Sequence, residues 1–406
     1  MMMKHRAYTS VFRAHLSALA LSFVALTTWA QQPQLTWLEP LSGYRDTEIF
    51  DISADGRIVV GRMRVSSNCQ SNDDVRPIVW TRDRGFTILK SDGYAGGFAR
   101  AISADGLTIV GNRNNCGGTY YGAVWTFNGL ATPSNAVEIC YDVSANSSVV
   151  VGGTTSFTGG RGTSPFRAFR WTPTGGIVNL GTLQGGNASW AYGVSADGSI
   201  VVGWSTDGSN TRRAFRWTQQ AGMESLGASV LIDNTSYSYD NSEALGISPN
   251  GQIIVGIAYD SLTLAVGFRN IRQGTRRVNI SLGDPPKGFT GVYPRRTNQD
   301  GSIIVGWMRK SDGTNRAMRW TEAGGLEDLN VTYANLLGEG EYLGAAYDIT
   351  PDGRYIVGWG VKDGKQQGFI LDTGVCDLPA DVDGNGIVND QDLLQVLFEF
   401  GNRCGQ

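Results

Sequence analysis

The chain has almost no histidine, and its two copies, His5 and His15, both lie near the N-terminus. There a basic start precedes an apolar run from Leu16 to Leu26, a pattern that predicts an export signal over residues 1–30 with cleavage after Ala30. The predicted mature chain therefore contains no histidine. This absence excludes Ser-His-Asp and Cys-His catalysis, and it also excludes any histidine-ligated metal site.

Long apolar runs and an excess of positive charge are also missing. No later segment reaches the ~18 apolar residues that a membrane span needs, so no span is expected. The chain holds 34 Lys and Arg against 37 Asp and Glu, and its formal net charge falls from −3 to −6 without residues 1–30. Because there is no basic stripe, we expect no nucleic-acid binding. An acidic exported protein is more suited to cations, glycans or other proteins.

Cysteine is scarce, with five residues in the whole chain: Cys69, Cys116, Cys140, Cys376 and Cys404. Export to an oxidising compartment permits disulfides. Cys376 and Cys404 flank the last motif of the chain and are predicted to pair. The other three allow one bond and one free thiol, and the sequence leaves that pairing open.

Self-similarity, by contrast, is abundant. Seven ten-residue segments align without gaps: 52–61, 102–111, 143–152, 194–203, 247–256, 297–306 and 349–358. Their closing glycines are 50, 41, 51, 53, 50 and 52 residues apart. Each segment, such as ISADGRIVVG, predicts a hairpin, because an Asp-Gly type turn precedes a Val/Ile run. Since these runs do not alternate with polar residues, the strands must be covered on both faces.

Further strands complete each repeat. A third strand is predicted at 76–80, 121–125, 167–171, 213–217, 266–270, 316–320 and 367–371, and a short fourth strand follows it. Four strands in ~50 residues make one propeller blade. The seventh unit lacks its fourth strand, whereas LTWLEPLSG (35–43) resembles a spare one. We therefore predict an all-β, seven-bladed β-propeller over 31–373, closed by the N-terminal strand. An open solenoid, which needs no spare strand, is the alternative.

These motifs resemble the HAF repeat of extracellular repeat proteins. The resemblance rests on the RAFRW-type segment with its following Gly-Gly-x-x-x-Leu-Gly stretch and on the ISADG-x-x-IVG hairpin, and it covers most of residues 45–371. The third unit departs from the pattern at Asn146-Ser147-Ser148, and the fifth has Asn270 in place of Trp. The resemblance implies a secreted, propeller-like fold and no particular reaction.

The C-terminal region, 374–406, contains a predicted calcium loop with the sequence DVDGNGIVNDQD at 381–392. Gly386 occupies the sharp turn at the sixth position. The predicted ligands have the oxygen-donor spacing of an EF-hand loop and are Asp381, Asp383, Asn385, the carbonyl of Ile387, Asn389 and Asp392. An apolar helix that includes Leu393 and Leu397 is predicted to follow, and it must pack on the propeller, on a second copy or on a partner.

A calcium loop followed by a helix, with Asp at the twelfth position, resembles one half of a type I dockerin. The resemblance implies Asp390 and Gln391 as partner-recognition residues and a cohesin-like or cell-surface protein as the partner. A full dockerin has two such repeats, whereas this chain has one. Together with the export signal, the resemblance suggests a bacterial source.

Several repeated side chains have two interpretations each. We expect turn chemistry rather than ligand binding for Asp55, Asp105, Asp197, Asp300 and Asp352. We expect packing between blades for Trp80, Trp125, Trp171, Trp217 and Trp320. Candidates for an exposed aromatic platform are Trp204, Trp307 and Trp359. Stacking and cross-strand pairing, with an anion site as the alternative, are expected for Arg167, Arg170, Arg213, Arg216, Arg316 and Arg319.

We predict a secreted, non-enzymatic binding or scaffold protein. Its propeller loops would bind a glycan or protein, and its C-terminal module would dock to a partner or cap the propeller. The alternative is a carbohydrate-active hydrolase or lyase held in place by the dockerin-like tail, because paired carboxylates can act without histidine. A cluster of carboxylates at one mouth of the ring would favour that alternative.

Overall fold

The computed structural model describes residues 32–65, 75–91, 93, 96–114, 120–126, 129–131, 138–155, 165–260 and 265–374. All of these residues belong to the unit Gln31–Gln406. The predicted calcium loop, the following helix and the predicted Cys376–Cys404 pair lie outside the described residues. So do Cys69 and Cys116.

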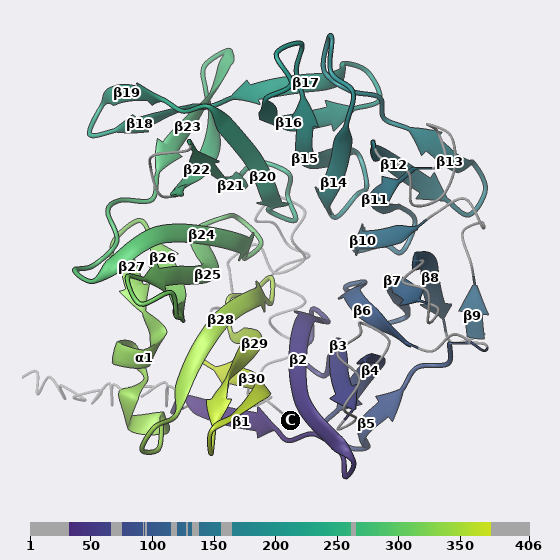
Figure 1. Ribbon diagram of the computed structural model, residues 1–406, viewed down its shortest axis with the longest axis vertical. Helices are drawn as coiled ribbons and strands as arrows, with labels where there is room; N and C mark the ends of the chain where they lie inside the picture. The colour runs from purple at the N-terminus through teal and green to yellow at the C-terminus, as the bar shows by residue number, and fades with distance from the viewer. Residues whose placement is uncertain are drawn as a thin grey trace, which may run out of the picture. The chain divides into compact units, whose positions relative to one another are not determined.

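The described part of the chain forms seven antiparallel blades around a common centre (Figure 1). The first blade contains β2 (Tyr44–Ile52), β3 (Ile58–Val65), β4 (Val75–Thr81) and β5 (Gly85–Ile88). The second contains β6 (Gly96–Ile102), β7 (Thr108–Asn114), β8 (Tyr120–Thr126) and β9 (Gly129–Ala131). The third contains β10 (Ile139–Val143), β11 (Val150–Thr154), β12 (Arg167–Thr172) and β13 (Gly176–Asn179). The fourth contains β14 (Ser189–Val194), β15 (Ile200–Thr206), β16 (Arg212–Thr218) and β17 (Gly222–Gly227).

The remaining three blades complete the ring. The fifth contains β20 (Asn241–Ile247), β21 (Ile254–Tyr259), β22 (Val266–Gln273) and β23 (Arg276–Ser281). The sixth contains β24 (Phe289–Thr297), β25 (Ile303–Lys310), β26 (Asn315–Thr321) and β27 (Gly325–Asp328). The seventh contains β28 (Tyr342–Ile349), β29 (Tyr355–Lys362), β30 (Lys365–Asp372) and β1 (Gln34–Leu38). The first strand of each repeat lies innermost. The strands that surround the centre of the ring are therefore β2, β6, β10, β14, β20, β24 and β28 (Figure 1).

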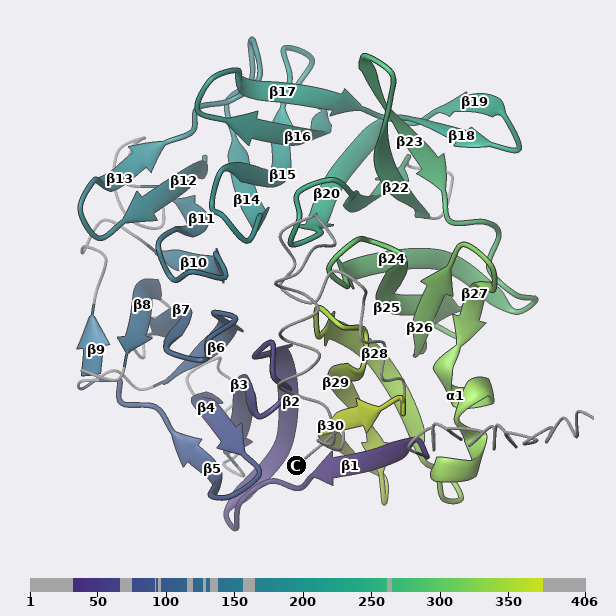
Figure 2. The same ribbon diagram turned by 180° about the vertical axis from the view of Figure 1, so that it is seen from behind.

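The seventh blade takes its outer strand from the N-terminal end of the propeller. β1 pairs antiparallel with β30, with Gln34 opposite Asp372 and Leu38 opposite Gly368, and Figure 2 shows the two strands side by side. The predicted closure is confirmed, and the open solenoid is excluded for the described residues.

Two features of the fold were not predicted. β18 (Ser229–Ile232) and β19 (Thr235–Ser238) form an extra hairpin, and β18 pairs in parallel with β23 to extend the fifth blade to six strands. A short helix, α1 (Leu329–Thr332), and a 3-10 turn at Ala334–Leu336 connect the sixth and seventh blades. Leu329 is fully buried and fixes the helix against β26 and β28.

The core consists of apolar layers between adjacent blades. Fully buried third-strand phenylalanines recur in four of the layers: Phe169, Phe215, Phe268 and Phe369. Consecutive second-strand residues such as Val59 and Val60 are both buried, as the unbroken Val/Ile runs predicted. Trp125 and Trp320 are buried, and Trp80, Trp171 and Trp217 pack half-buried against the layers. The predicted blade packing of these tryptophans is confirmed.

The repeated aspartates stabilise the turns between first and second strands. In the first blade Asp55 Oδ1 accepts hydrogen bonds from the Ser53 hydroxyl (2.6 Å) and the Arg57 amide (3.0 Å). The same pair of contacts recurs at Asp105, Asp197 and Asp352, and Asp300 accepts from the Ser302 amide. The predicted turn role is therefore confirmed.

A β-bulge interrupts the inner strand of every blade. The extra residues are Phe50, Arg100, Tyr141, Tyr192, Leu245, Arg295 and Tyr347. The closing glycine of each repeat faces this bulge across the ladder. A Cβ atom at Gly203 would lie 1.9 Å from the Trp190 carbonyl oxygen, and the corresponding distances in the seven blades span 1.9–2.2 Å. The repeat therefore keeps glycine there because the bulged strand leaves no room for a side chain.

Candidate ligand site in the central channel

Five of the seven bulge residues line a cavity of about 230 Å³ in the central channel of the ring. Its lining residues are Phe50, Arg100, Tyr141, Arg295, Arg296, Trp307 and Tyr347. All except Arg296 and Trp307 are extra residues of a bulge. Because a bulge re-aims one side chain and leaves the rest of the strand in register, each blade can point one residue at the cavity without losing its ladder.

One side of the cavity is aromatic. The Trp307 ring is stacked on Tyr293 (5.4 Å between centroids, 4° between planes) and meets Tyr347 edge-on at 5.9 Å. Tyr347 also contacts Phe50 at 5.7 Å. The Tyr347 hydroxyl donates to Glu48 Oε1 (2.8 Å) and accepts from Trp359 Nε1 (3.2 Å), which fixes the ring in place. This wall is therefore rigid and apolar, with its one hydroxyl already paired.

The other side carries two guanidinium groups around one phenol. Arg100 lies over the rings of Phe98 (5.0 Å) and Tyr141 (5.2 Å), and its Nε donates to Asn112 Oδ1 (3.1 Å). Arg295 also lies over the Tyr141 ring (5.2 Å) and donates from Nη2 to the Tyr141 hydroxyl. Neither arginine forms an ion pair with a carboxylate among the described residues. Burial lowers the pKa of Arg100, and repulsion from Arg295 lowers it further, although Tyr141 opposes both.

Tyr141 is correspondingly acidic for a buried phenol. Burial alone would raise its pKa, but the positive charges of Arg295 and Arg100 outweigh burial and lower it below its ordinary value. The neighbouring bulge phenols show the opposite direction, since burial raises the pKa values of Tyr192 and Tyr347. The contrast locates the positive potential of the channel at Tyr141.

Arg296 lines the cavity, and the charges of three buried aspartates act on its guanidinium group. These floor aspartates are Asp51, Asp142 and Asp348. Arg296 Nη2 pairs with Asp142 Oδ1 (3.3 Å), and its Nη1 donates to the Leu245 carbonyl (3.2 Å). The carboxyl groups of Asp51 and Asp348 act on each other electrostatically. Burial, followed by the charge of Asp348, raises the pKa of Asp51 well above its ordinary range, and burial raises that of Asp142 to about 6 despite Arg296.

The floor aspartates also connect adjacent inner strands. Asp51 accepts the amide of Ile102 (2.7 Å) in the next blade. Asp142 does the same with Val194 (3.0 Å), and Asp348 with Ile52 (3.2 Å). These carboxylates are thus committed to contacts between blades. Burying these carboxylates costs free energy, and the hydrogen bonds to the adjacent strands partly offset that cost.

Two contacts cross the channel from the sixth blade to the third, which are not neighbours in the ring. They are the hydrogen bond from Arg295 to Tyr141 and the ion pair between Arg296 and Asp142. The channel is therefore bridged at the level of the bulges.

The predicted aromatic platform is only partly correct. Trp307 lines the channel cavity, as described above. Trp204 is buried. The Arg212 guanidinium lies over the Trp204 ring at 4.2 Å, and Trp204 Nε1 donates to the Tyr192 hydroxyl (3.3 Å). The expected exposure of Trp204 is therefore wrong. Trp359 is half-buried and supports Tyr347. The closing glycine directs these side chains inward, toward the inner strand, rather than out to the loops.

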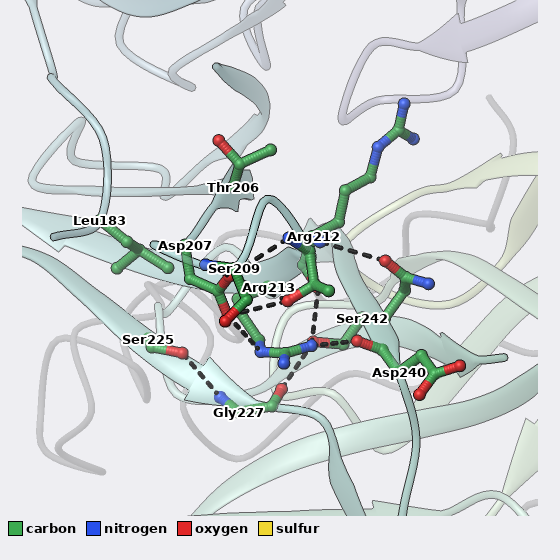
Figure 3. A network of polar contacts seen from close by, with 12 residues as sticks. Leu183, Thr206, Asp207, Ser209, Arg212, Arg213, Ser225, Gly227, Asp240 and Ser242 are labelled. Carbon is green, nitrogen blue, oxygen red and sulfur yellow. Dashed lines mark hydrogen bonds and ion pairs between the residues drawn. The ribbon is translucent and has the colours of Figure 1, made fainter. Parts of the chain in front are cut away.

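The repeated arginines outside the channel make the expected structural contacts. Arg216 pairs with Glu224 (3.4 Å) and Arg319 with Glu327 (2.8 Å) across adjacent strands, and Arg316 stacks on Tyr342 (4.0 Å). Figure 3 shows Arg213 between Asp207 (3.1 Å) and the carbonyl of Asp240, a contact that ties the fourth blade to the fifth. Arg167 and Arg170 donate to the carbonyls of Asn187 and Gly198 in the same way.

Two larger hollows elsewhere each contain an arginine that is paired with a carboxylate. A hollow of about 750 Å³ at the junction of the first and seventh blades contains Arg354, held bidentately by Asp372 at 2.9 and 3.0 Å. A hollow of about 600 Å³ beside the fourth blade contains Arg212, paired with Glu243 at 2.6 Å. In the channel cavity, neither Arg100 nor Arg295 has a carboxylate partner among the described residues.

The predicted metal and partner residues lie outside the described residues: Asp381, Asp383, Asn385, Ile387, Asn389, Asp390, Gln391, Asp392, Leu393 and Leu397. Within the described ranges no group of three or more Asp, Glu, Cys or His side chains is placed to hold a metal ion. Cys140 there is a buried free thiol, and burial raises its pKa to about 12. No helix among the same residues is long and apolar enough to cross a membrane.

No family model and no curated protein sequence matches the chain. Among solved structures, the fold is similar to oligogalacturonate lyase in complex with manganese, with a TM-score of 0.52 and 12% identity over 83% of this chain and 92% of the other. The fold is also similar to oligogalacturonate lyase from Vibrio parahaemolyticus, with a TM-score of 0.52 and 11% identity over 83% of this chain and 93% of the other. For the β-propeller domain of the Trilobed protease from Pyrococcus furiosus, the TM-score is 0.48 and the identity 9%, over 81% of this chain and 96% of the other. At these identities the similarity establishes the β-propeller fold alone.

Proposed function

We propose that this chain is a secreted, non-enzymatic binding propeller whose channel site takes a small organic anion. The observation that carries the proposal is the pair of inward-facing guanidinium groups, Arg100 and Arg295, without a carboxylate partner among the described residues. An unpaired cation withdrawn from water is costly, and an anionic ligand removes that cost by forming charge-assisted hydrogen bonds. The aromatic wall supplies the apolar surface that most small-molecule sites also provide.

Calorimetry on the full chain tests this function. Small carboxylates, sugar acids, sulfate and phosphate are titrated into the native protein and into Arg295→Gln, with Arg84→Gln, an exposed arginine far more open to solvent, as the matched control. We expect at least one anion to bind to the native protein and to the control, and to bind about tenfold or more weakly to Arg295→Gln. If no anion binds, or if both variants bind equally well, the channel is not an anion site.

The C-terminal region extends the proposal. Asp381, Asp383, Asn385, Ile387, Asn389 and Asp392 would supply the oxygens for one calcium ion, and Asp390, Gln391, Leu393 and Leu397 would contact a cohesin-like or cell-surface partner. Calcium that binds only the folded loop would stabilise it. We expect calcium titration of the full chain to give one site that is lost in the double variant Asp381→Asn with Asp383→Asn. Retention of the site in that variant would refute the ligand assignment.

One observation favours an enzyme as the second candidate function. Tyr141 has a lowered pKa between two arginines, the arrangement that a lyase needs to remove the proton beside a carboxylate. The Tyr141 phenolate would take the C5 proton of a uronate, and the electron pair of the C5–H bond would form the C4–C5 double bond as the C4–oxygen bond breaks. The departing oxygen would then take the proton from the Tyr141 hydroxyl, which would return Tyr141 to the phenolate. Incubation with uronate oligosaccharides would then generate the ultraviolet absorbance of an unsaturated product. The floor carboxylates, which contact adjacent blades, do not favour a hydrolase.

A further inference from the structure

The size of the channel cavity limits what it can hold. Its volume of about 230 Å³ corresponds to roughly eight water molecules at ~30 Å³ each, and it lies below the ~300 Å³ at which drug-sized pockets begin. A single sugar residue fits such a space, whereas two linked residues do not. The channel therefore accepts one residue of a larger molecule or one small molecule.

The contacts that cross the channel limit how a saccharide chain could enter the cavity. Arg296 and Asp142 pair across the channel at the level of the bulges, and their side chains are only 14% and 13% exposed. The contacts from Arg295 to Tyr141 and from Arg296 to Asp142 join opposite blades. A polymer cannot thread through a channel bridged in this way. Only a chain end can reach the two arginines.

The distribution of charge favours a carboxylate over a phosphate. Arg100 and Arg295 offer forked donors to one anion, while the negative charge of the nearby Asp142 repels a second negative charge on the ligand. The Trp307–Tyr347 wall suits the apolar face of a sugar ring. A uronic acid residue, with one carboxylate and an apolar ring face, combines these features.

From this combination we infer that the channel binds the terminal uronic acid residue of an acidic saccharide, with its carboxylate on Arg100 and Arg295. The inference rests on the proposed anion-binding function and specifies its ligand. The chain end enters the cavity, and the remainder of the saccharide stays outside the ring.

Titration calorimetry with galacturonic acid oligosaccharides of graded length tests the inference on the full chain. We expect one protein molecule to bind to each saccharide chain, at its end. Because longer chains have fewer ends per unit mass, the number of binding sites at equal saccharide mass should fall as the chains lengthen. Neutral galactose oligosaccharides and inorganic phosphate are the comparison ligands and should bind at least about tenfold more weakly. Arg100→Gln and Arg295→Gln should each weaken uronate binding by about tenfold to a hundredfold, whereas Arg84→Gln should not.

The outcomes separate this inference from the function on which it rests. Several proteins bound along one long chain, or equal binding of the neutral oligosaccharides, would overturn end recognition by the two arginines. Binding of phosphate or another small anion, but not of uronate, would refute the uronate assignment and leave the anion site standing. No anion binding at all would refute both. Arg295→Lys, which keeps the charge but loses the fork, provides a second variant with a milder change should Arg295→Gln unfold.

Discussion

The closing glycine of the repeat provides the sharpest test of the fold. In the fourth blade a Cβ atom on Gly203 would lie 1.9 Å from the carbonyl oxygen of Trp190, 2.9 Å from its carbonyl carbon and 3.0 Å from the Cα of Ala191. All three atoms are backbone, so no side-chain rotation relieves the contact. We expect Gly203→Ala to destabilise the propeller strongly, because the whole of β14 must move away from β15.

The magnitude follows from the size of that movement. An ordinary contact needs about 1.5 Å more separation than the carbonyl allows, enough to break the ladder bonds beside the bulge. Overpacking in a tight core costs roughly 1–3 kcal/mol, and loss of about two backbone hydrogen bonds adds ~1 kcal/mol each. The expected decrease in the free energy of unfolding is therefore about 3–5 kcal/mol. At ~2 °C per kcal/mol for a large domain, the melting temperature should fall by about 6–10 °C.

Gly208, in the loop that follows β15, is the matched control. A Cβ atom there has no neighbour closer than 3.7 Å, so Gly208→Ala should change the free energy of unfolding by less than ~1 kcal/mol in either direction. Thermal denaturation followed by circular dichroism compares the two variants. If Gly203→Ala melts within about 2 °C of Gly208→Ala, the bulge does not explain the glycine and the reasoning is wrong.

Three further predictions concern other parts of the ring. Because burial raises the pKa of Asp142 from 3.8 to about 6, the folded state binds a proton at this carboxylate more tightly than the unfolded state does. The stability that Asp142 contributes in this way is complete below pH 3.8 and is lost as the pH rises through about 6. The melting temperature should therefore rise as the pH is lowered from 7.5 to 5. A melting temperature that falls over that interval would contradict the raised pKa of Asp142. Trp37→Ala removes the edge-to-face contact of β1 with Phe369 (6.3 Å) and should lower the free energy of unfolding by about 2–3 kcal/mol in urea denaturation; an unchanged midpoint would mean that β1 is not needed for closure. Cys140 should resist iodoacetamide in the folded protein and react in urea, since its thiol is buried with a pKa of about 12; mass spectrometry of the Cys140 peptide would expose the opposite result.

The repeat pattern predicted the fold well because its signals are local. Asp-Gly turns, paired Val/Ile runs and the spare strand near Trp37 each specify a neighbour in sequence or a missing partner in the ring. The hairpin at β18 and β19 was missed although it has a local signal. Asp233 and Asn234 both adopt positive φ (48° and 63°), as a tight hairpin turn requires, but the dipeptide lacks the glycine that would have marked it.

The channel site could not be predicted in the same way. The residues that line the cavity are distant from one another in sequence. Five of them have only their place in the repeat in common, because each lies two residues before the start of an aligned hairpin segment. That position holds Phe50, Arg100 and Tyr141 in three successive blades, whereas the repeat nearby hardly varies. Variation within an otherwise regular repeat was the available signal. Which blades face one another, and which arginines remain unpaired, depends on closure of the ring and therefore appears only in three dimensions.

Closure by β1 has a consequence for the order of folding. The strand that contains Gln34 is synthesised before any blade, yet its partner around Asp372 is the last strand of the ring. Until β30 exists, β1 has no ladder to join, and joining it requires closing a loop that comprises the rest of the propeller. Such a long-range pairing is expected to be slow. An incomplete ring meanwhile exposes the edge of β30, which β1 from another molecule could occupy, so that strand exchange between chains competes with closure at high protein concentration.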